Sequence, residues 1–586
     1  MIMKTSSIFF CRLIFISIAV FAGYNRCLAT DSPVLFFTDF NSGPKTGLGD
    51  GTGSGAIVTV WGRNLGAVPV NSKLYIGTDG NWHEAAHIYY WKNADGQLPG
   101  GPSDVYSFHK MQEIAFSIPE GVSDGPVKIK VNVNGVDSNQ LDFTVRSGNM
   151  YFIDDTSPGN PGSGTFSDPW RSPASFINRI NSSGANEDGA IAYFKSGNYS
   201  EQYAQLNWSA NFCLGANHSG QNNLENVFSV YPGERPVIDS MADTMRTGFR
   251  LYSTMPEYIT VSKMSIHSMR GSLEAGDNWR AVGNLLNGIH ELSASGVIVP
   301  SGNNIILYGN EMTGGTSANK LDHAIYPNRG ADNVDIGWNY IHDNNWAEGP
   351  MISINNNEAY DLGYTFENIR IHHNVIDVTQ YPSRAVGVFE TGAGSTIYVY
   401  SNIIKGPAPS GSPSVYAMSG NVHYYNNSLY EAGAGNMGSA FSFYSSVTYE
   451  HLYAPESIEI KNNVVHVNPG SSLYIRVTGD APAPDISNNC YFGIGTYNPA
   501  TGNSGIDTGA INADPIYNNS SGNDFSLTYN SPCIDTGQAL VDNLFKNDFT
   551  GIARPQSSGW DIGAHEFISG ETDTAPPTIP GGLRIR

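Results

Sequence analysis

Between residues 278 and 492 the chain repeats one pattern of apolar and polar positions. Each repeat is a short segment in which apolar and polar residues alternate, followed by an Asn and usually by two apolar residues, as in NIILYGNEM, NVDIGWNYI and NIRIHHNVI. Alternation with a period of two predicts β-strands. The repeated residues are Asn284, Asn310, Asn339, Asn374, Asn402, Asn427, Asn463 and Asn489.

The spacing of these asparagines indicates a solenoid. Successive spacings are 26, 29, 35, 28, 25, 36 and 26 residues, so a constant core carries insertions of variable length. This is typical of stacked coils whose loops project from one side. A stacked Asn amide can donate and accept along the axis, and Asn tolerates the left-handed backbone of a sharp turn. We therefore predict that these asparagines are structural and not catalytic.

A second strand follows the inserted loop of each repeat, in segments such as HAIYPNR, PMISINNN, AVGVFET and SVYAMS. Because side chains alternate between the two faces of a strand, the pattern predicts one inward and one outward column. The inward column is Ile325, Ile352, Val386, Val415 and Phe441; the outward column includes Tyr326, Ser353, Gly387, Tyr416 and Tyr444 or its neighbours. We interpret the outward face, with its aromatic rings and amides, as a sugar-binding groove; aromatic stacks that only pad the coil are the alternative.

The segment 33–146 reads as a separate small β domain. AIVTVWGRNLG alternates and then turns at Gly62–Gly66, and IPEGVSDGPVKIKV and SNQLDFTV supply further strands between Gly, Asp and Asn turns. This segment resembles the immunoglobulin-like IPT/TIG family. The resemblance implies a β-sandwich that spaces or binds and carries no catalysis.

The rest of the chain resembles a known superfamily at both ends. MYFIDDTSPGNPGSGTFSDPW, a short helical stretch and AIAYFKSGNYSEQ are similar to the N-terminal entry of right-handed parallel β-helix proteins of the pectate-lyase-like superfamily. SPCIDTGQ, DFTGIARP and WDIGAHEF resemble the terminal signature of secreted members. The resemblance implies an all-β solenoid, capped by the helix, over residues 149–567. It also implies structural turns and ion pairs at Asp535, Asp548, Arg554 and Asp561.

The complete predicted organisation has four parts. Residues 1–30 read as a signal peptide, with Lys4 and Arg12 before the apolar run IFISIAVFAG and a cleavage position after Ala29; a membrane anchor is the alternative. The IPT/TIG-like sandwich spans residues 31–148, the β-helix 149–567 and a flexible tail 568–586. We therefore expect a secreted, monomeric protein without a membrane span after cleavage.

The amino-acid composition limits the classes of molecule that the protein can bind. Gly is frequent (65 residues), only 14% of residues are charged, and the net charge is −22. Removing the predicted signal peptide, with three basic and no acidic residues, changes this to 28 − 53 = −25. Such an acidic chain without a basic stripe excludes nucleic acid as a partner. Cys213, Cys490 and Cys533 are an odd set outside the leader, and which of them pair stays open.

One central repeat contains a high density of titratable side chains. NKLDHAIYPNRG, residues 319–330, and HDNNWAEGP on the next coil bring titratable side chains to one loop-to-strand corner, although a solvated loop is the alternative. The candidate catalytic residues are Lys320, Asp322, His323, Arg329 and Glu348. The candidate substrate-binding residues are Tyr326, Asn328, Trp346, Asn355, Arg384, Phe389, Glu390 and Tyr416.

Two reactions fit this corner. In β-elimination of a uronate, a cation neutralises the carboxylate while a base removes the C5 proton, and Lys320, His323 or Arg329 could serve. In glycoside hydrolysis two carboxylates flank the bond, for which Asp322 with Glu348 or Asp343, or Glu348 with Glu390, are the pairs. The β-helix architecture hosts both reactions and also non-catalytic adhesins. The irregular, loop-rich repeats favour a polysaccharide-degrading enzyme, with a lyase acting on an acidic glycan ahead of a hydrolase.

Metal and histidine roles are secondary. Ca²⁺ held by Asp, Glu and Asn oxygens is compatible with this chemistry, but no calcium-loop motif is present, so the metal stays an open alternative. His342 lies near the loop. His372 and His373 lie in an Asn-bearing strand, where we expect one to face solvent and the other to pack.

Overall fold

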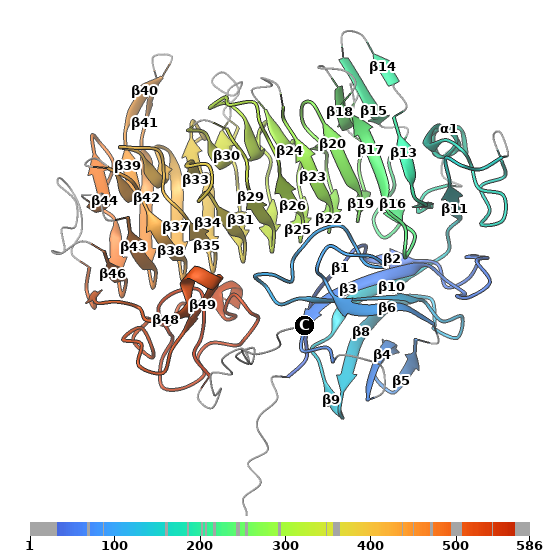
Figure 1. Cartoon of the computed structure of the whole chain (residues 1–586), viewed down its shortest axis with the longest axis horizontal. Helices are drawn as coiled ribbons and strands as arrows, with labels where there is room; N and C mark the ends of the chain where they lie inside the picture. The colour runs from blue at the N-terminus through green and yellow to red at the C-terminus, as the bar shows by residue number, and fades with distance from the viewer. Residues whose placement is uncertain are drawn as a thin grey trace, which may run out of the picture.

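The computed structural model describes residues 32–568 apart from short gaps. The gaps are residues 67–70, 86, 159–161, 184–186, 201–202, 206–207, 215–217, 242–245, 252–255, 291–294, 347, 356–363, 436–437, 449–450, 469–472, 494–506 and 542. The predicted signal peptide and residues 569–586 of the predicted tail lie outside the described residues. Figure 1 shows a long stack of strands, with an N-terminal β domain and a C-terminal segment on the same side of it.

The first ten strands form two packed sheets. One has the order β1 (Val34–Thr38), β3 (Ile57–Arg63), β7 (Gln112–Ser117) and β6 (Ile88–Asn93). The other has the order β2 (Ser42–Gly43), β10 (Leu141–Val145), β8 (Gly125–Val133), β4 (Ser72–Thr78) and β5 (Asn81–Glu84), with β9 (Val136–Asp137) beside β8. Apolar residues of both sheets share one core, as expected from their alternation. We call this unit the sandwich; its membership of the IPT/TIG family stays a prediction.

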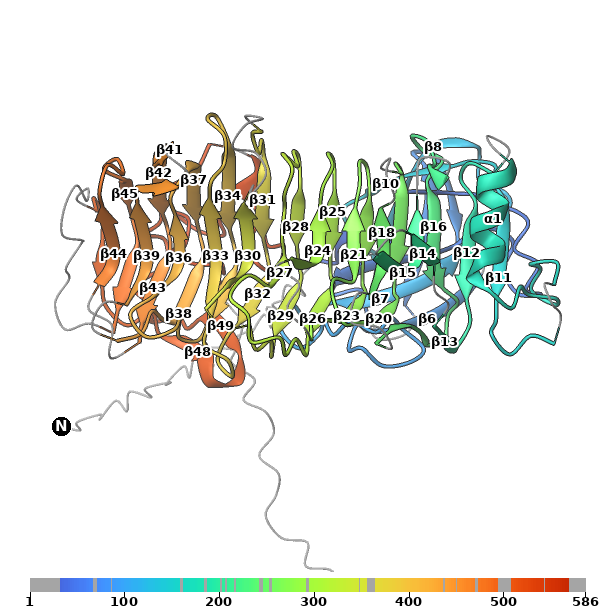
Figure 2. The ribbon, with the colours of Figure 1, turned by 90° about the horizontal axis from the view of Figure 1, so that it is seen from above.

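Three long, almost entirely parallel sheets form the solenoid, and Figure 2 shows them from above. Sheet A comprises β11 (Met150–Ile153), β12 (Ile191–Phe194), β16 (Asn226–Val230), β19 (Ile259–Ser262), β22 (Arg280–Val282), β25 (Ile306–Tyr308), β28 (Asp335–Gly337), β31 (Ile369–His372), β34 (Thr396–Tyr400), β37 (Gly420–Tyr425), β42 (Pro455–Lys461) and β45 (Asp485–Ser487). Sheet B comprises β13 (Gly197–Tyr199), β17 (Pro236–Ser240), β20 (Ser265–Ser268), β23 (Leu285–Gly288), β26 (Glu311–Thr313), β29 (Tyr340–His342), β32 (Val375–Asp377), β35 (Ile403–Lys405), β38 (Ser428–Ala432), β43 (Val464–Val467), β46 (Cys490–Phe492) and β47 (Ile511–Asn512).

Sheet C completes each coil. It comprises β14 (Tyr203–Gln205), β15 (Trp208–Leu214), β18 (Arg246–Leu251), β21 (Leu273–Ala275), β24 (Gly296–Pro300), β27 (His323–Ile325), β30 (Pro350–Asn355), β33 (Arg384–Phe389), β36 (Pro413–Ala417), β39 (Ser439–Tyr444) and β44 (Leu473–Thr478). The remaining elements are the helix α1 (Pro173–Ser183), the hairpins β40 (Ser446–Thr448) with β41 (His451–Tyr453) and β48 (Tyr517–Asn519) with β49 (Asp524–Leu527), and two short 3₁₀ helices, Ser520–Gly522 and Asn543–Phe545. This architecture is the predicted parallel β-helix.

The solenoid core follows from the alternation in sequence. The predicted inward residues of sheet C lie in register, with Ile325 beside Ile352 and Val386 beside Val415 and Ile352. All five predicted inward side chains are fully buried. Phe176, Ile177 and Ile180 of α1 pack into the same core, so the helix caps the N-terminal end as predicted.

The predicted asparagines form one continuous ladder. From Asn310 onward, the Oδ1 of each accepts hydrogen bonds from the preceding Asn; between Asn339 and Asn374 these come from the backbone N–H at 3.0 Å and from Nδ2 at 2.9 Å. The first Oδ1, that of Asn284, accepts from the Met264 N–H. Each Nδ2 also donates to a backbone carbonyl, as from Asn374 to Ile336 at 2.9 Å. At the end of the ladder Asn489 donates to Asp507 Oδ2 at 2.9 Å. All eight side chains are buried, which confirms the structural role.

The sandwich docks against sheet A through buried polar contacts. Lys263 Nζ lies 3.0 Å from Asp39 Oδ2 of the sandwich and donates to Thr59 Oγ1 at 2.7 Å, and this pair is almost completely buried. Arg280 on the next coil donates to the Thr38 carbonyl at 2.8 Å. These bonds fix the sandwich to the side of the solenoid away from sheet C (Figure 1).

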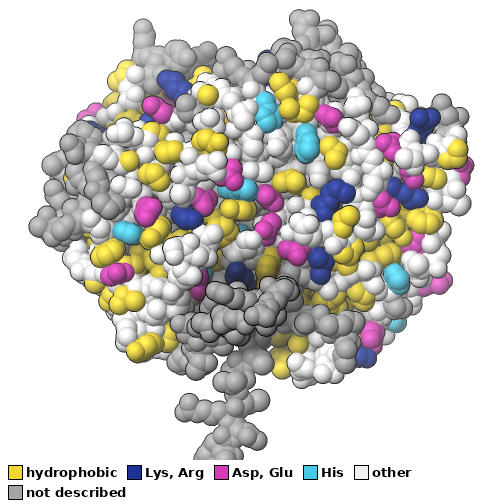
Figure 3. All heavy atoms as spheres, viewed as in Figure 1, with side chains coloured by type: hydrophobic (Ala, Val, Ile, Leu, Met, Phe, Trp, Pro, Cys, Tyr) yellow, Lys and Arg dark blue, Asp and Glu magenta, His cyan; other side chains and the backbone are white. Residues whose placement is uncertain are grey.

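Charges on the face shown in Figure 3 are mixed, with acidic side chains beside basic ones. On sheet B, Lys405 Nζ lies 3.3 Å from Asp377 Oδ2. His342 lies between Glu311 and Asp343, at 3.1 and 2.8 Å. The two carboxylates raise the pKa of His342 although burial opposes this.

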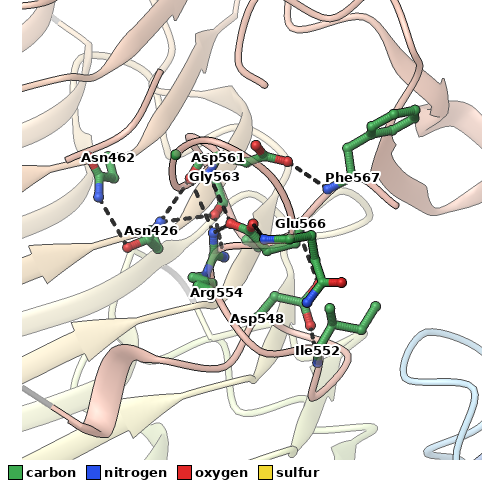
Figure 4. A network of polar contacts seen from close by, with 12 residues as sticks. Asn426, Asn462, Asp548, Ile552, Arg554, Asp561, Gly563, Glu566 and Phe567 are labelled. Carbon is green, nitrogen blue, oxygen red and sulfur yellow. Dashed lines mark hydrogen bonds and ion pairs between the residues drawn. The ribbon is translucent and has the colours of Figure 1, made fainter. Parts of the chain in front are cut away.

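The C-terminal segment returns along the solenoid and is fixed by its own polar network (Figure 4). Arg554 pairs with Glu566 at 2.6 Å and donates to the Gly563 carbonyl at 2.8 Å, with both charged side chains buried. Asp548 Oδ2 accepts from the Glu566 N–H at 2.9 Å, and Asp561 Oδ1 accepts from the Asp535 N–H at 2.7 Å. The predicted structural role of these acidic residues and of Arg554 is confirmed.

One expectation about the histidines is wrong. His372 and His373 are both buried, at 4% and 5% exposure, so neither faces solvent. His372 Nε2 lies 2.6 Å from Asp335 Oδ1, and His373 Nε2 lies 2.9 Å from the Asp548 carbonyl. The returning C-terminal segment covers the position that the strand pattern left open.

Candidate functional site

A cavity of about 190 Å³ opens on the outer face of sheet C, beside β27, β30, β33 and β36. Figure 2 shows this sheet facing the viewer, on the side opposite the sandwich and the C-terminal segment in Figure 1. The residues that line the cavity are Lys320, Leu321, His323, Tyr326, Pro350, Asn355, Arg384, Phe389 and Tyr416. All except Leu321 and Pro350 are among the predicted site residues, and they come from four coils.

His323 supplies an uncharged imidazole to this cavity. It is the first residue of β27 and only 4% exposed, and its Nδ1 lies 2.7 Å from the Pro350 carbonyl on the next coil. A carbonyl can only accept, so Nδ1 carries the proton and Nε2 carries the lone pair. Burial lowers the pKa of His323 to about 4, although the Pro350 carbonyl and Asp322 oppose this. The ring therefore stays neutral near pH 7 and offers Nε2 as a proton acceptor.

Two cations lie beside this imidazole without a carboxylate partner. Lys320 is exposed on the loop before β27, and in the described part of the chain its ammonium makes no ion pair. The Arg384 guanidinium donates to the Glu348 carbonyl and, at 3.0 Å, to Ser412 Oγ, which fixes its orientation. Since a guanidinium has five N–H groups, several remain available to an anion.

Aromatic rings continue the cavity along the sheet. The rings of Phe389 and Tyr416 are 5.7 Å apart and nearly parallel, and Tyr416 stacks on Tyr444 at 6.3 Å. Arg384 lies over the Tyr416 ring at 5.5 Å. Gly387 makes room for this arrangement, because a Cβ there would meet the Tyr416 ring at 2.7 Å. Such flat surfaces can pack against the C–H faces of sugar rings.

Two predicted residues point elsewhere. Trp346 is only 1% exposed and belongs to the solenoid core, where its Nε1 donates to the Ile289 carbonyl at 3.4 Å, so a sugar cannot reach it. Asp322 is fully buried, and its Oδ1 accepts from the Ser295 N–H at 3.4 Å. The charge of Asp322 opposes the lowering of the His323 pKa. Both lie on loops, where no periodic pattern distinguishes inward from outward.

Four further predicted residues do not line the cavity. Glu348 and Arg329 are exposed, and both have a left-handed backbone, with φ of 62° and 56°. Asn328 accepts a hydrogen bond from Ser301 Oγ at 2.8 Å, and Glu390 lies just past β33. The carboxylate pairs predicted for hydrolysis thus do not converge on this cavity, and no described residue that lines it is acidic.

Arg476 belongs to the same outer face but was not among the predicted site residues. In β44 the neighbours Ile475 and Val477 are buried, so Arg476 points outward on the face that holds Tyr416. The register pairs Arg476 with Ser442 and Ser442 with Tyr416. Ser442, not Tyr444, therefore continues the predicted outward column, and Tyr444 stands two residues further along β39. The alternation in LYIRVT would have identified Arg476 as outward.

Among the described residues, no group of three or more His, Cys, Asp and Glu side chains is placed to hold a metal ion. No helix in the described ranges is long and apolar enough to cross a membrane. The predicted alternative of Ca²⁺ stays a prediction.

Comparisons with known proteins give only distant similarities. No model of a protein family matches the chain. No curated protein is significantly similar to it in sequence. At these distances no activity is transferred to this chain from another protein.

Three solved structures with partial similarity are enzymes that act on carbohydrates. A GH136 lacto-N-biosidase from Eubacterium ramulus is 11% identical with a TM-score of 0.32, and the match covers 61% of this chain and 65% of that one. The catalytic domain of a GH87 α-1,3-glucanase is 9% identical with a TM-score of 0.31, covering 74% and 82%. A PL6 alginate lyase is 13% identical with a TM-score of 0.28, covering 69% and 59%. The chain thus spans less than two thirds of the lacto-N-biosidase.

Proposed function

We propose that this protein is a secreted polysaccharide lyase that cleaves a uronate-containing glycan by β-elimination. The observation that carries the proposal is the cavity itself. It places two cations without carboxylate partners, Lys320 and Arg384, beside the neutral imidazole of His323. In a protein of net charge −22, such a local concentration of positive charge favours an anionic ligand.

Each group has a distinct role in the elimination. Arg384 binds the uronate carboxylate and withdraws charge from C5, because the guanidinium matches a carboxylate and stays protonated. His323 Nε2 takes the C5 proton. The C5–H electron pair forms the C4=C5 double bond, the C4–O4 bond breaks, and the Lys320 ammonium protonates the departing O4. Asn355 and Tyr416 orient the sugar ring at the cavity wall.

The environment of His323 suits a base that must stay unprotonated. Its donor Nδ1 is held by Pro350, so the ring cannot turn its lone pair away from the cavity. The low pKa makes it a weak base, and the adjacent cations compensate by acidifying the C5 proton of a bound uronate. Tyr416 keeps its proton, because burial raises its pKa, and so remains a hydrogen-bond donor.

A substrate panel tests the proposal. The protein, produced without residues 1–30, is incubated with polyuronates, sulfated glycans and neutral glucans, and both ultraviolet absorbance of the unsaturated product and new reducing ends are followed. Absorbance that rises together with reducing ends on a polyuronate supports the lyase. Reducing ends without absorbance would establish a hydrolase, and binding without either product would establish a non-catalytic carbohydrate-binding protein. Both of these outcomes overturn the proposal.

A further inference from the structure

A third cation lies on the same face of sheet C, beyond the cavity. Arg476 is half-buried in β44, between the buried Ile475 and Val477. Within the described residues, its guanidinium makes no ion pair and no hydrogen bond. On the other two sheets, Lys461 in the same coil and Lys405 two coils earlier contact carboxylates at 2.7 and 3.3 Å. An arginine held on an ordered strand without a partner is prepared to bind an anion from outside the chain.

The aromatic rings connect this arginine to the cavity. Arg476 is the partner of Ser442 in the sheet, and Tyr444 stands two residues further on the same face of β39, which makes the two side chains diagonal neighbours. Tyr444 in turn stacks on Tyr416 at the cavity wall. Burial raises the pKa of Tyr444, and the positive charges of Arg384 and Arg476 both act against this rise.

The register fixes how far apart the two arginines are. Arg384 is in β33 and Arg476 in β44, and β36 and β39 lie between them. Neighbouring strands are about 4.8 Å apart, so the backbones of the two arginines are separated by about 14 Å along the solenoid axis. The register aligns Arg476 with Gly387, through Ser442 and Tyr416, so Arg384 is also displaced by three residues, about 10 Å, along its strand. A sugar unit is similar in length to one strand spacing. A chain of uronates that places one carboxylate at Arg384 therefore carries another past Tyr444 to Arg476.

We propose that Arg476 and Tyr444 form a distal subsite that binds a second carboxylate of the same polyuronate chain. This deepens the proposed function and rests on it for the position of the cleaved bond. Substrate would lie parallel to the solenoid axis, with its rings on Phe389, Tyr416 and Tyr444. The protein then prefers long chains over short ones, and the preference comes from Arg476.

The test compares chain lengths in three variants. Arg476→Gln removes the charge, Arg476→Lys keeps the charge but loses the planar fork, and Arg171→Gln is the charge-matched control. Arg171 is exposed just before α1, at the opposite end of the solenoid. Initial rates are measured on oligouronates of graded length. For chains long enough to reach β44, Arg476→Gln should raise KM about tenfold with kcat unchanged, Arg476→Lys should raise it less, and Arg171→Gln should not change it.

Short chains provide the discriminating result. A uronate dimer or trimer held at the cavity ends before Arg476, so its KM should be the same in the wild type and in Arg476→Gln. The proposal is overturned if Arg476→Gln leaves the KM of long chains unchanged, or if it weakens short and long chains equally. The dependence of KM on salt should also become less steep in the variant, because one charge contact with the polymer is lost.

Failure of the proposed reaction can be separated from failure of the subsite. If the wild type cleaves no polyuronate, the same oligomers are used in calorimetric titrations. A loss of affinity confined to long chains in Arg476→Gln would then support the subsite while overturning the lyase. Equal affinity of wild type and variant for every length would overturn the subsite, whatever the reaction.

Discussion

The outer faces of the three sheets differ in whether their Lys and Arg side chains are paired with carboxylates. On sheet A, Arg370 contacts Asp335 at 2.8 Å, and on sheet B Lys405 contacts Asp377 at 3.3 Å. Sheet C has such a pair near its start, where Arg250 faces Glu274 at 3.9 Å. From β27 onward, Arg384 and Arg476 have no carboxylate partner among the described residues, and neither has Lys320 on the loop before β27. Faces with paired cations and the face with unpaired cations are therefore built from the same repeated coil.

This difference distinguishes charges that are neutralised within the fold from charges that stay available to a ligand. A paired cation has its charge neutralised within the chain, and in the case of Lys263 the pair is buried under the docked sandwich. An unpaired cation beside a cavity gives little to stability and remains available to a ligand. The molecule therefore uses sheet A to carry the sandwich and leaves the outer face of sheet C, where the cavity lies, uncovered by it.

The test with the largest expected effect compares the replacement of a histidine on sheet C with the replacement of one on sheet B. His323→Gln keeps a donor for the Pro350 carbonyl but removes the proton acceptor, so kcat on a polyuronate should fall by about 10²- to 10⁴-fold. His342→Gln, on sheet B between Glu311 and Asp343, should leave kcat unchanged. Steady-state kinetics with circular dichroism as a check on folding measure both. Wild-type kcat in a folded His323→Gln protein would remove His323 from the mechanism.

The second test exchanges lysines. Lys263→Met leaves the buried Asp39 carboxylate without its cation and should lower the free energy of unfolding by about 3–5 kcal/mol. Lys320→Met, on the exposed loop, should change it by less than about 0.5 kcal/mol while reducing turnover. Equilibrium denaturation monitored by tryptophan fluorescence measures both variants. Similar losses in the two would mean that the cation beside the cavity is also structural.

The third test uses pH. The pKa of His323 is lowered from 6.5 to about 4, so between these values the unfolded chain binds more protons than the folded one. Stability contributed by this site is therefore complete above pH 6.5 and is lost as pH falls to about 4, by at most about 3 kcal/mol. His342, with its raised pKa, has the opposite sign: its contribution is present at low pH and is lost as pH rises through that pKa. Unfolding of each Gln variant against wild type across this range should show slopes of opposite sign.

The smallest expected effect concerns the aromatic wall. Gly387→Ala places a Cβ 2.7 Å from the Tyr416 ring and should displace it from Phe389, raising KM by about 2- to 10-fold with little change in kcat. Gly248→Ala in β18, whose Cβ would meet the Ser272 carbonyl at 2.5 Å on the same sheet, is a control for local strain away from the cavity. Equal KM values in wild type and Gly387→Ala would mean that ring stacking does not contribute to binding.

Periodic features of this protein could be predicted from its sequence. The alternation of HAIYPNR and AVGVFET predicted that Ile325 and Val386 point inward, and the repeated Asn predicted the ladder that Asn374 continues. Loop residues followed no such rule. Trp346 and Asp322 lie in the same stretch of sequence as His323 but do not line the cavity, because a loop between two strands can turn either way and packing against the core decides which. The histidine pair was likewise misjudged because Asp548 comes from 175 residues further along the chain.

The sequence by itself determined the coil: a period of two fixes which side of each strand is buried, and an amide at every turn fixes how neighbouring coils align. Only the tertiary structure decided which face is open. The sandwich and the C-terminal segment cover their sides of the solenoid through contacts such as Asp39 with Lys263, which join positions more than two hundred residues apart. Such contacts leave no local pattern, and neither does the assembly of Lys320, His323 and Arg384 from separate coils. The local sequence pattern sets the strand register on which the cavity depends. Which faces of the solenoid are covered depends on packing between segments that are distant in the sequence.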